Sequence, residues 1–307
     1  MTSEVTIGKT NVQTTKLGLG TNKVGGHNLF PGLKDEDGYA LVKQALDAGV
    51  QLIDTAHMYG EGRSEEIIGD VIQGYDRSKI VIATKGAQDA NNGNKPNNAP
   101  AFLKQAVEDS LKRLKTDYID IFYIHFPDQD TPKGEAVAAL NELKEEGKIR
   151  AIGVSNFSLD QIKEANKNNQ VDIVEDHYSL VYRAAEKEEW AYLKEHQISF
   201  VPYFPLASGL LTGKYTSADY SKFEKQYSQE QFAAVLSALD QVKAIADEHQ
   251  VTVAQTILAW YMANTAITAV IPGARNADQV AANLKATDVT LSAVEFETID
   301  QAFAAFK

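Results

Sequence analysis

Cysteine is absent from this chain of 307 residues. Its absence excludes disulfide bonds, cysteine-ligated zinc or iron–sulfur sites and a thiol nucleophile. Basic side chains are in the minority, because 30 lysines and arginines stand against 42 acidic residues and leave a formal net charge of -12. Nucleic acids and anionic membrane surfaces both require a basic face, so neither is expected as a partner. Any catalysis must use oxygen or nitrogen groups or a cofactor.

Long apolar runs are scarce as well. The first residues, Met1 to Val12, lack the basic and apolar stretches of a secretory signal, which favours a cytoplasmic protein. One charge-free segment, Val251–Ala274, approaches the roughly 20 apolar residues that cross a bilayer. Gln255, Asn264 and Thr268 interrupt it, so we predict a buried helix followed by a buried strand in place of a membrane span.

Short apolar runs alternate with helical patterns along almost the whole chain. A hairpin is predicted first, from Val5–Ile7 and Val12–Thr15. Eight short apolar runs follow: Lys16–Leu19, Val50–Ile53, Ile80–Thr84, Ile119–Ile124, Ala151–Val154, Ile173–Val174, Ser199–Tyr203 and Ala269–Ile271. Capping-box pairs mark four helix starts: Ser158 with Gln161, Ser228 with Gln231, Thr252 with Gln255 and Ser292 with Glu295. Doubly apolar strands separated by helices form parallel sheets, and eight of them predict a closed (βα)8 TIM barrel of the α/β class.

The barrel pattern accounts for the length of the chain. A barrel of this type uses about 250 residues. The surplus fits two extra helices, Phe232–Ala246 after the seventh strand and Val294–Phe306 at the C-terminus. No linker or repeat divides the sequence, so residues 1–307 are predicted to form a single domain. Gln88–Asn98 and Gly209–Tyr227 are predicted to be loops on the face where the strands end, the first of them mobile.

Ionisable residues follow three of the predicted strands directly. Asp54 ends the second strand and is followed by Tyr59, Lys85 follows the third strand, and His125 follows the fourth. Functional groups of such barrels collect at this end of the strands. Each residue alone has a structural explanation. Asp54 could cap the next helix and Lys85 could point to solvent. His125 could lie at the rim without a role, and Tyr59 could pack within its loop.

Together the four residues have a chemical logic. A tyrosine hydroxyl titrates near 10, so it becomes a useful acid only where a cation stabilises the phenolate. Lys85 can supply that cation, and Asp54 can supply the counter-charge that a buried ammonium needs. His125 can offer a ring N–H to orient a carbonyl oxygen. This set suits protonation of a carbonyl oxygen while hydride arrives at carbon.

With these motifs, the sequence resembles the aldo-keto reductase family. The matching stretches are GLGT at 18–21, LIDTAHMYG at 52–60, ATKG at 83–86, DYIDIFYIH at 117–125, GVSNF at 153–157, YFPLASGLLTGKY at 203–215 and IPGARN at 271–276. The resemblance covers nearly the whole chain and is strongest to the bacterial general stress and inositol-locus branch. It implies that Asp54, Tyr59, Lys85 and His125 form the catalytic tetrad of an NAD(P)H-dependent enzyme that reduces a small aldehyde or ketone.

The nicotinamide cofactor must be held by the barrel itself. No GxGxxG follows a strand, and GLLTGK at 209–214 fails the P-loop pattern. The resemblance implies that Tyr203 stacks under the nicotinamide, Ser155 and Asn156 bond its carboxamide, and other residues hold the rest of the dinucleotide. The full set implied for the cofactor is Gly20, Thr21, Asp54, Ser155, Asn156, Glu175, Tyr203, Leu206, Ser208, Lys214, Gly273, Arg275, Gln279 and Asn283.

Two of these positions bear on cofactor choice and affinity. Arg275 is the main candidate to meet a 2′-phosphate, since a guanidinium forks onto phosphate oxygens, so NADPH is favoured and NADH is possible. Glu175 stands where the family usually has glutamine. A carboxylate accepts from the carboxamide NH2 but donates to its oxygen only when protonated. Glu175 also has the alternative of pairing with a cation such as Lys85 or Arg183.

Three other functions are considered. A regulatory or sensor subunit on the same fold would bind the cofactor with little turnover. A barrel glycosidase could use Asp54 and Glu175 as a carboxylate pair roughly 5 to 9.5 Å apart, but Lys85 and Tyr59 would then have no task. A metal-dependent hydrolase is the weakest of the three, because the six histidines show no HExxH motif or paired ligand spacing, and no metal site is predicted. No pattern in the chain identifies the physiological substrate, the direction of reaction or the oligomeric state.

Overall fold

Seven short strands form one parallel sheet in the computed structural model, which describes residues 4–307. In sheet order they are β3 (Leu19–Gly20), β4 (Leu52–Asp54), β5 (Val81–Gly86), β8 (Ile119–Ile124), β9 (Ile149–Ser155), β10 (Ile173–His177) and β11 (Ser199–Tyr203). Almost all their residues are buried, since the barrel interior covers one face and helices cover the other.

The ring is closed by the segment around Val270. The amide of Thr268 donates to Phe200 O on β11 at 2.8 Å, and the amide of Val270 donates to Lys16 O at 2.8 Å. On the same side as Lys16, the amide of Gly18 donates to Val270 O at 2.9 Å. Isolated bridges therefore stand in the eighth position, where a strand was expected at Ala269–Ile271. The predicted (βα)8 barrel is confirmed, with a final strand too short to form a continuous ladder.

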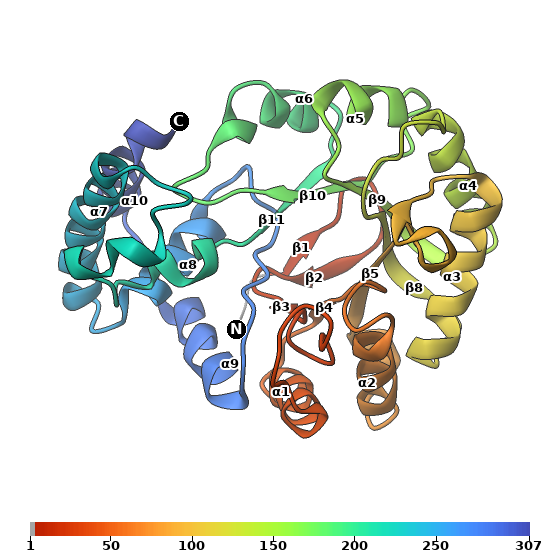
Figure 1. The fold of residues 1–307 in the computed structure, drawn as a ribbon, viewed down its shortest axis with the longest axis horizontal. Helices are drawn as coiled ribbons and strands as arrows, with labels where there is room; N and C mark the ends of the chain where they lie inside the picture. The colour runs from red at the N-terminus through yellow and green to blue at the C-terminus, as the bar shows by residue number, and fades with distance from the viewer. Residues whose placement is uncertain (1–3) are drawn as a thin grey trace.

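Helices surround the strands, as Figure 1 shows. They are α1 (Asp35–Asp47), α2 (Arg63–Ile72), α3 (Pro100–Leu114), α4 (Lys133–Glu145), α5 (Leu159–Ala165), α6 (Glu189–Glu195), α7 (Gln229–Glu248), α8 (Val253–Ala263), α9 (Ala277–Leu284) and α10 (Ala293–Ala302). The two predicted extra helices are α7 and α10, which contact each other. All four capping boxes form as predicted. Within residues 4–307, no helix combines the length and apolar content that a membrane crossing requires.

The predicted hairpin covers the N-terminal end of the barrel. Strands β1 (Glu4–Thr6) and β2 (Gln13–Thr15) pair antiparallel and cross the middle of the ring in Figure 1. Ile7 and Val12 at the turn are buried among the residues that fill the barrel interior. The amide of Gly8 donates to Ser199 Oγ at 2.8 Å. The hairpin therefore plugs this end, and the functional groups gather at the other.

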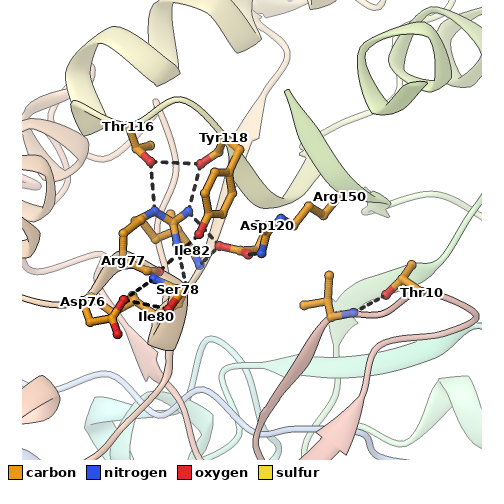
Figure 2. A network of polar contacts seen from close by, with 11 residues as sticks. Thr10, Asp76, Arg77, Ser78, Ile80, Ile82, Thr116, Tyr118, Asp120 and Arg150 are labelled. Carbon is orange, nitrogen blue, oxygen red and sulfur yellow. Dashed lines mark hydrogen bonds and ion pairs between the residues drawn. The ribbon is translucent and has the colours of Figure 1, made fainter. Parts of the chain in front are cut away.

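A polar network joins strand starts at the N-terminal end of the barrel (Figure 2). Asp120, at the start of β8, is 2% exposed and accepts from Arg77 at 2.8 Å and from Arg150 at 3.2 Å. Arg77 also donates to the backbone oxygen of Tyr118 at 2.9 Å, and both guanidinium groups lie over the Tyr118 ring. Asp120 also accepts the amide of Ile82 on β5 at 3.0 Å, so this buried carboxylate ties β5, β8 and β9 together.

The segment predicted as a mobile loop at Gln88–Asn98 is instead a small hairpin of β6 (Gln88–Asp89) and β7 (Lys95–Pro96). The Asp89 side chain orders it by accepting the amide of Asn91 at 2.9 Å and the Asn97 side chain at 3.3 Å. The second predicted loop contains two 3-10 segments, Ala207–Thr212 and Ser217–Lys222. The Asp89 side chain explains why residues 88–98 form an ordered turn, because a single carboxylate that accepts nearby N–H groups is enough to fix one.

Candidate active site

A buried ion pair lies at the C-terminal mouth of the barrel. Asp54 ends β4, Lys85 lies near the end of the neighbouring β5, and Lys85 Nζ is 2.5 Å from Asp54 Oδ1. The same ammonium donates to Thr55 O at 3.1 Å. The residues are 3% and 1% exposed, so the pair is removed from water. A buried ammonium is stable only with such partners.

A second carboxylate meets the same ammonium from across the barrel. Glu175 on β10 is 2% exposed, and its Oε1 lies 3.2 Å from Lys85 Nζ. Its other oxygen, Oε2, is buried and has no hydrogen-bond partner within residues 4–307. Burial and then the Asp54 carboxylate raise the pKa of Glu175 well above its usual value. Burial lowers the pKa of Lys85, but the two carboxylates outweigh it and raise that pKa.

Tyr59 lies beside this pair, in the loop after β4. Lys85 Nζ is 5.6 Å from the centroid of the Tyr59 ring. Burial raises the pKa of Tyr59, and the attraction of Lys85 for the phenolate opposes that shift only in part. Lys85 was expected to lower this pKa outright, but the neighbouring carboxylates of Asp54 and Glu175 also act to raise it. Tyr59 is therefore a protonated acid at neutral pH.

His125 completes the group from the end of β8. Its ring meets the Tyr59 ring edge-on, with centroids 6.4 Å apart, and stacks on Phe126 at 4.6 Å. Burial and the positive charge of Lys85 lower the pKa of His125 well below its usual value. The ring is therefore neutral and keeps one N–H to donate. The structure thus brings the four residues singled out from the sequence into one cluster.

A hydrogen-bonded chain connects this cluster to Tyr203 at the end of β11. The Tyr203 hydroxyl donates to Asn156 Oδ1 at 2.7 Å, and Asn156 Nδ2 donates to His125 O at 3.0 Å and to Ser155 Oγ at 3.1 Å. The Tyr203 ring stacks on His177 at 5.4 Å with an interplanar angle of 9°. One face of the ring is therefore covered, and its orientation is fixed from both ends. Asn156 has to exchange partners before it can bond a ligand.

The backbone after Tyr203 is strained. Phe204, Ala207 and Ser208 have positive φ angles of 56°, 46° and 55°, a region that side chains with a Cβ seldom adopt. Leu206 and Ser208, both expected to flank the cofactor pyrophosphate, lie in this segment, and Ser208 is exposed. Strained backbone persists only where the surrounding fold holds it in place, and it is most common at active sites and ligand-binding segments.

Three cations converge near this mouth. Lys23, half-buried, has its pKa lowered by burial and then by the charges of Arg275 and Lys214. None of the three lies within 4.0 Å of a carboxylate among residues 4–307. In an acidic protein, a cluster of cations without carboxylate partners is suited to an anionic ligand. Arg275 and Lys214 were expected here, whereas Lys23 was missed.

Five other residues expected at the cofactor differ in their burial and in their contacts. Thr21 is fully buried, and its hydroxyl donates to Asp54 O at 2.7 Å, so its side chain ties the ends of β3 and β4 together. A Cβ at Gly20 would lie 2.8 Å from Ile271 O, so glycine is required by the closing segment. Gly273 is exposed, and Gln279 Oε1 accepts the amide of Arg275 at 2.8 Å. Asn283 lies half-buried on the same helix, α9.

The sequence matches the model of a protein family described as "Aldo/keto reductase family" over residues 16–304. The chain belongs to this family. It is 34% identical to the "NADH-specific methylglyoxal reductase" of Escherichia coli over 311 residues, which cover 94% of each chain. It is 33% identical to the "Probable voltage-gated potassium channel subunit beta" of Arabidopsis thaliana over 318 residues, covering 96% of this chain and 94% of the relative.

A solved structure agrees with the family assignment. The glycerol dehydrogenase AKR11B4 from Gluconobacter oxydans matches with a TM-score of 0.86 and 30% identity, covering 99% of this chain and 95% of that one. As a member of the aldo/keto reductase family, the chain is an oxidoreductase that acts on carbonyl compounds. The glycosidase alternative loses its basis, because the Lys85 ammonium contacts both Asp54 and Glu175 and leaves neither free to flank a sugar.

Two parts of this aldo/keto reductase site had no decisive sequence signal. Lys23 follows GLGTN and could have been noted as a cation beside a glycine-rich turn, but its approach to Arg275 depends on the closure of the barrel. The aromatic stack of Tyr182, His177 and Tyr203 was also missed. The ring centroids of His177 and Tyr182 are 4.2 Å apart, so the three rings form one stack that supports one face of Tyr203.

Proposed function

We propose that this protein is an NADPH-dependent reductase of small aldehydes or ketones, in which Tyr59 donates the proton that completes the alcohol. The observation that carries the proposal is the buried Asp54–Lys85 pair beside the Tyr59 ring, with neutral His125 at the ring edge. The proposal includes a single barrel domain over residues 1–307.

Each of the four side chains of the cluster has a separate role in the reaction. The cofactor, when bound, supplies the hydride. The Tyr59 hydroxyl donates its proton to the carbonyl oxygen as negative charge develops there, and the Lys85 ammonium stabilises the phenolate left behind. The N–H of neutral His125 orients the same oxygen. Asp54 holds Lys85 in place, so the ammonium does not move into solvent.

The structure offers fitting partners for a dinucleotide. The Tyr203 ring is stacked on one side by His177, which leaves its other face for a planar ring. The unpaired cations Lys23, Lys214 and Arg275 suit phosphate groups. Arg275 supports NADPH over NADH, because only NADPH has a 2′-phosphate for a guanidinium to grip.

The test follows the oxidation of NADPH and of NADH at a fixed protein concentration against a panel of small aldehydes and ketones. We expect turnover with several carbonyl compounds, higher with NADPH at low cofactor concentration. No turnover with any of them would remove the proposed function. A preference for NADH would remove the role of Arg275 while leaving the reductase intact.

A cofactor-binding regulatory or sensor subunit is the second candidate. It is favoured by the relative from Arabidopsis thaliana, which is named as a probable channel subunit. The same assay separates the two, since such a subunit would bind the cofactor tightly in a fluorescence titration and still turn over slowly with every carbonyl compound.

A further inference from the structure

One buried ammonium serves two buried carboxylates in this site. Lys85 Nζ lies 2.5 Å from Asp54 Oδ1 and 3.2 Å from Glu175 Oε1, and each of the three side chains is at most 4% exposed. If both carboxylates were ionised, the cluster would hold a net negative charge out of water, which is costly in an apolar surrounding. One proton shared between the carboxyl groups makes the cluster neutral.

The contacts of the two carboxyl groups indicate which one holds that proton. Asp54 has the shorter contact with the ammonium, which favours its ionised form. Glu175 has the longer contact, and its Oε2 has no partner within residues 4–307. An oxygen with no donor beside it gains least from being charged. Burial raises the pKa of Glu175 well above its usual value, in agreement with this order.

The groups around Glu175 come from all sides of the barrel mouth. Asp54 and Lys85 face it from β4 and β5, Tyr59 from the loop after β4, Tyr123 from β8 and Tyr203 from β11. Lys85 is the only cation among them. A negative charge on Glu175 therefore acts directly against ionisation of the tyrosines, Tyr59 included.

We propose that Glu175 is a positioning residue that shares Lys85 with Asp54, carries the proton that keeps the cluster neutral, and releases it in alkaline solution so that Tyr59 stays in its acid form. This inference rests on the proposed function for the role of Tyr59, but not for the protonation of Glu175. Below the pH at which Glu175 ionises, the site resembles one with a neutral amide. Above that pH, the added charge opposes the loss of the Tyr59 proton.

As a consequence, the Tyr59 hydroxyl stays protonated at a higher pH than it would beside a neutral side chain. In the Glu175→Gln variant, Tyr59 faces a cluster that is neutral at every pH, so its proton is lost earlier. In acidic solution, where native Glu175 is also uncharged, the two proteins should have the same pH dependence of kcat, whatever the absolute rate of the variant. The alkaline decline of kcat should move to lower pH by about one unit, because the variant lacks the negative charge of Glu175 that raises the pKa of Tyr59.

The first experiment measures protonation directly, in the protein without cofactor. Burial also raises the pKa of Asp176 to about 7 and that of Glu189 to about 8, so the Glu175 band is taken from the difference between the spectra of the native protein and Glu175→Gln. At neutral pH this difference should contain the infrared band of a protonated carboxylic acid, and the band should disappear as pH rises. Glu65 provides the control, since it is also fully buried but has Arg113 at 2.6 Å and the Thr84 hydroxyl at 2.6 Å. Glu65→Gln should remove no such band.

The second experiment compares the pH profiles of kcat for carbonyl reduction in the native protein and Glu175→Gln. Absence of the Glu175-dependent band at neutral pH, or superimposable alkaline limbs, would overturn the inference. If neither protein reduces any carbonyl compound, the proposed function fails, and the infrared band alone still decides whether Glu175 holds the proton. A variant that shows the shifted limb and lacks the band supports both parts.

Discussion

Replacing Lys85 by methionine probes the buried cluster through stability. The substitution keeps the length of the side chain and leaves Asp54 and Glu175 facing each other without a cation. Removing one partner of a buried pair costs about 3–5 kcal/mol. A chain of this size loses about 2 °C in Tm per kcal/mol, so Tm should fall by roughly 6–10 °C at pH 8.

The pH dependence gives the sharper test. Without Lys85, burial and mutual repulsion raise the pKa of both carboxyl groups above the value of about 4 that they have in the unfolded chain. A raised pKa contributes stability below the unfolded value and loses it as pH rises through the folded value. The deficit of Lys85→Met relative to the native protein should therefore shrink as pH falls from 8 toward 5, when thermal unfolding is followed by circular dichroism.

Two controls accompany this measurement. Lys43→Met breaks an exposed pair with Asp47 and should change Tm little at any pH. Adding Asp54→Asn to Lys85→Met removes one of the stranded carboxylates and should recover part of the lost Tm. If Lys85→Met lowers Tm no more than Lys43→Met does, or if it lowers Tm by the same amount at every pH, the cluster is not the buried, charge-balanced unit described above.

Further predictions concern the reaction and its cofactor. Tyr59→Phe should lower reductase kcat by about 10²–10⁴ while the cofactor dissociation constant, measured by fluorescence, stays near the native value; native turnover in the variant would refute the role of Tyr59. Arg275→Ala should weaken NADPH about ten- to a hundredfold and NADH little, and equal small changes for both would mean that Arg275 is only a surface residue. Lys23→Ala should weaken both cofactors to a similar extent and reduce the salt dependence of binding; an effect on NADPH alone would place Lys23 at the 2′-phosphate. The Glu175 carboxyl lies on Lys85, so Glu175→Gln should leave the dissociation constant of the cofactor near the native value from pH 6 to 8; tighter binding that no longer depends on pH would place Glu175 at the carboxamide instead.

Much of the fold follows from periodicity that can be read along the chain. Apolar runs such as Ile119–Ile124 identify buried strands, and Ser228 with Gln231 identifies a helix start, because both signals are local. The cluster of Asp54, Lys85 and His125 is predictable for a related reason. Residues at the ends of parallel strands in a barrel share one rim, whatever the exact register.

Contacts that cross the barrel cannot be predicted from local patterns in the sequence. Glu175 reaches Lys85 although β10 and β5 are not neighbours in the sheet, and a choice between Lys85 and Arg183 as its partner could not be made from spacing. Arg183 proves to be engaged with Glu186 and Asp300. Lys23 feels the charge of Arg275 only because the two ends of the chain meet where the barrel closes.

That closure also bears on how the protein is made. The bonds from Val270 to Lys16 and Gly18 connect segments from opposite ends of the sequence. During synthesis, β3 and β11 therefore both present unpaired backbone edges until the segment around Val270 has left the ribosome. Open parallel edges pair readily with other chains. We therefore expect a chain cut before Val270 to keep both edges open and to aggregate.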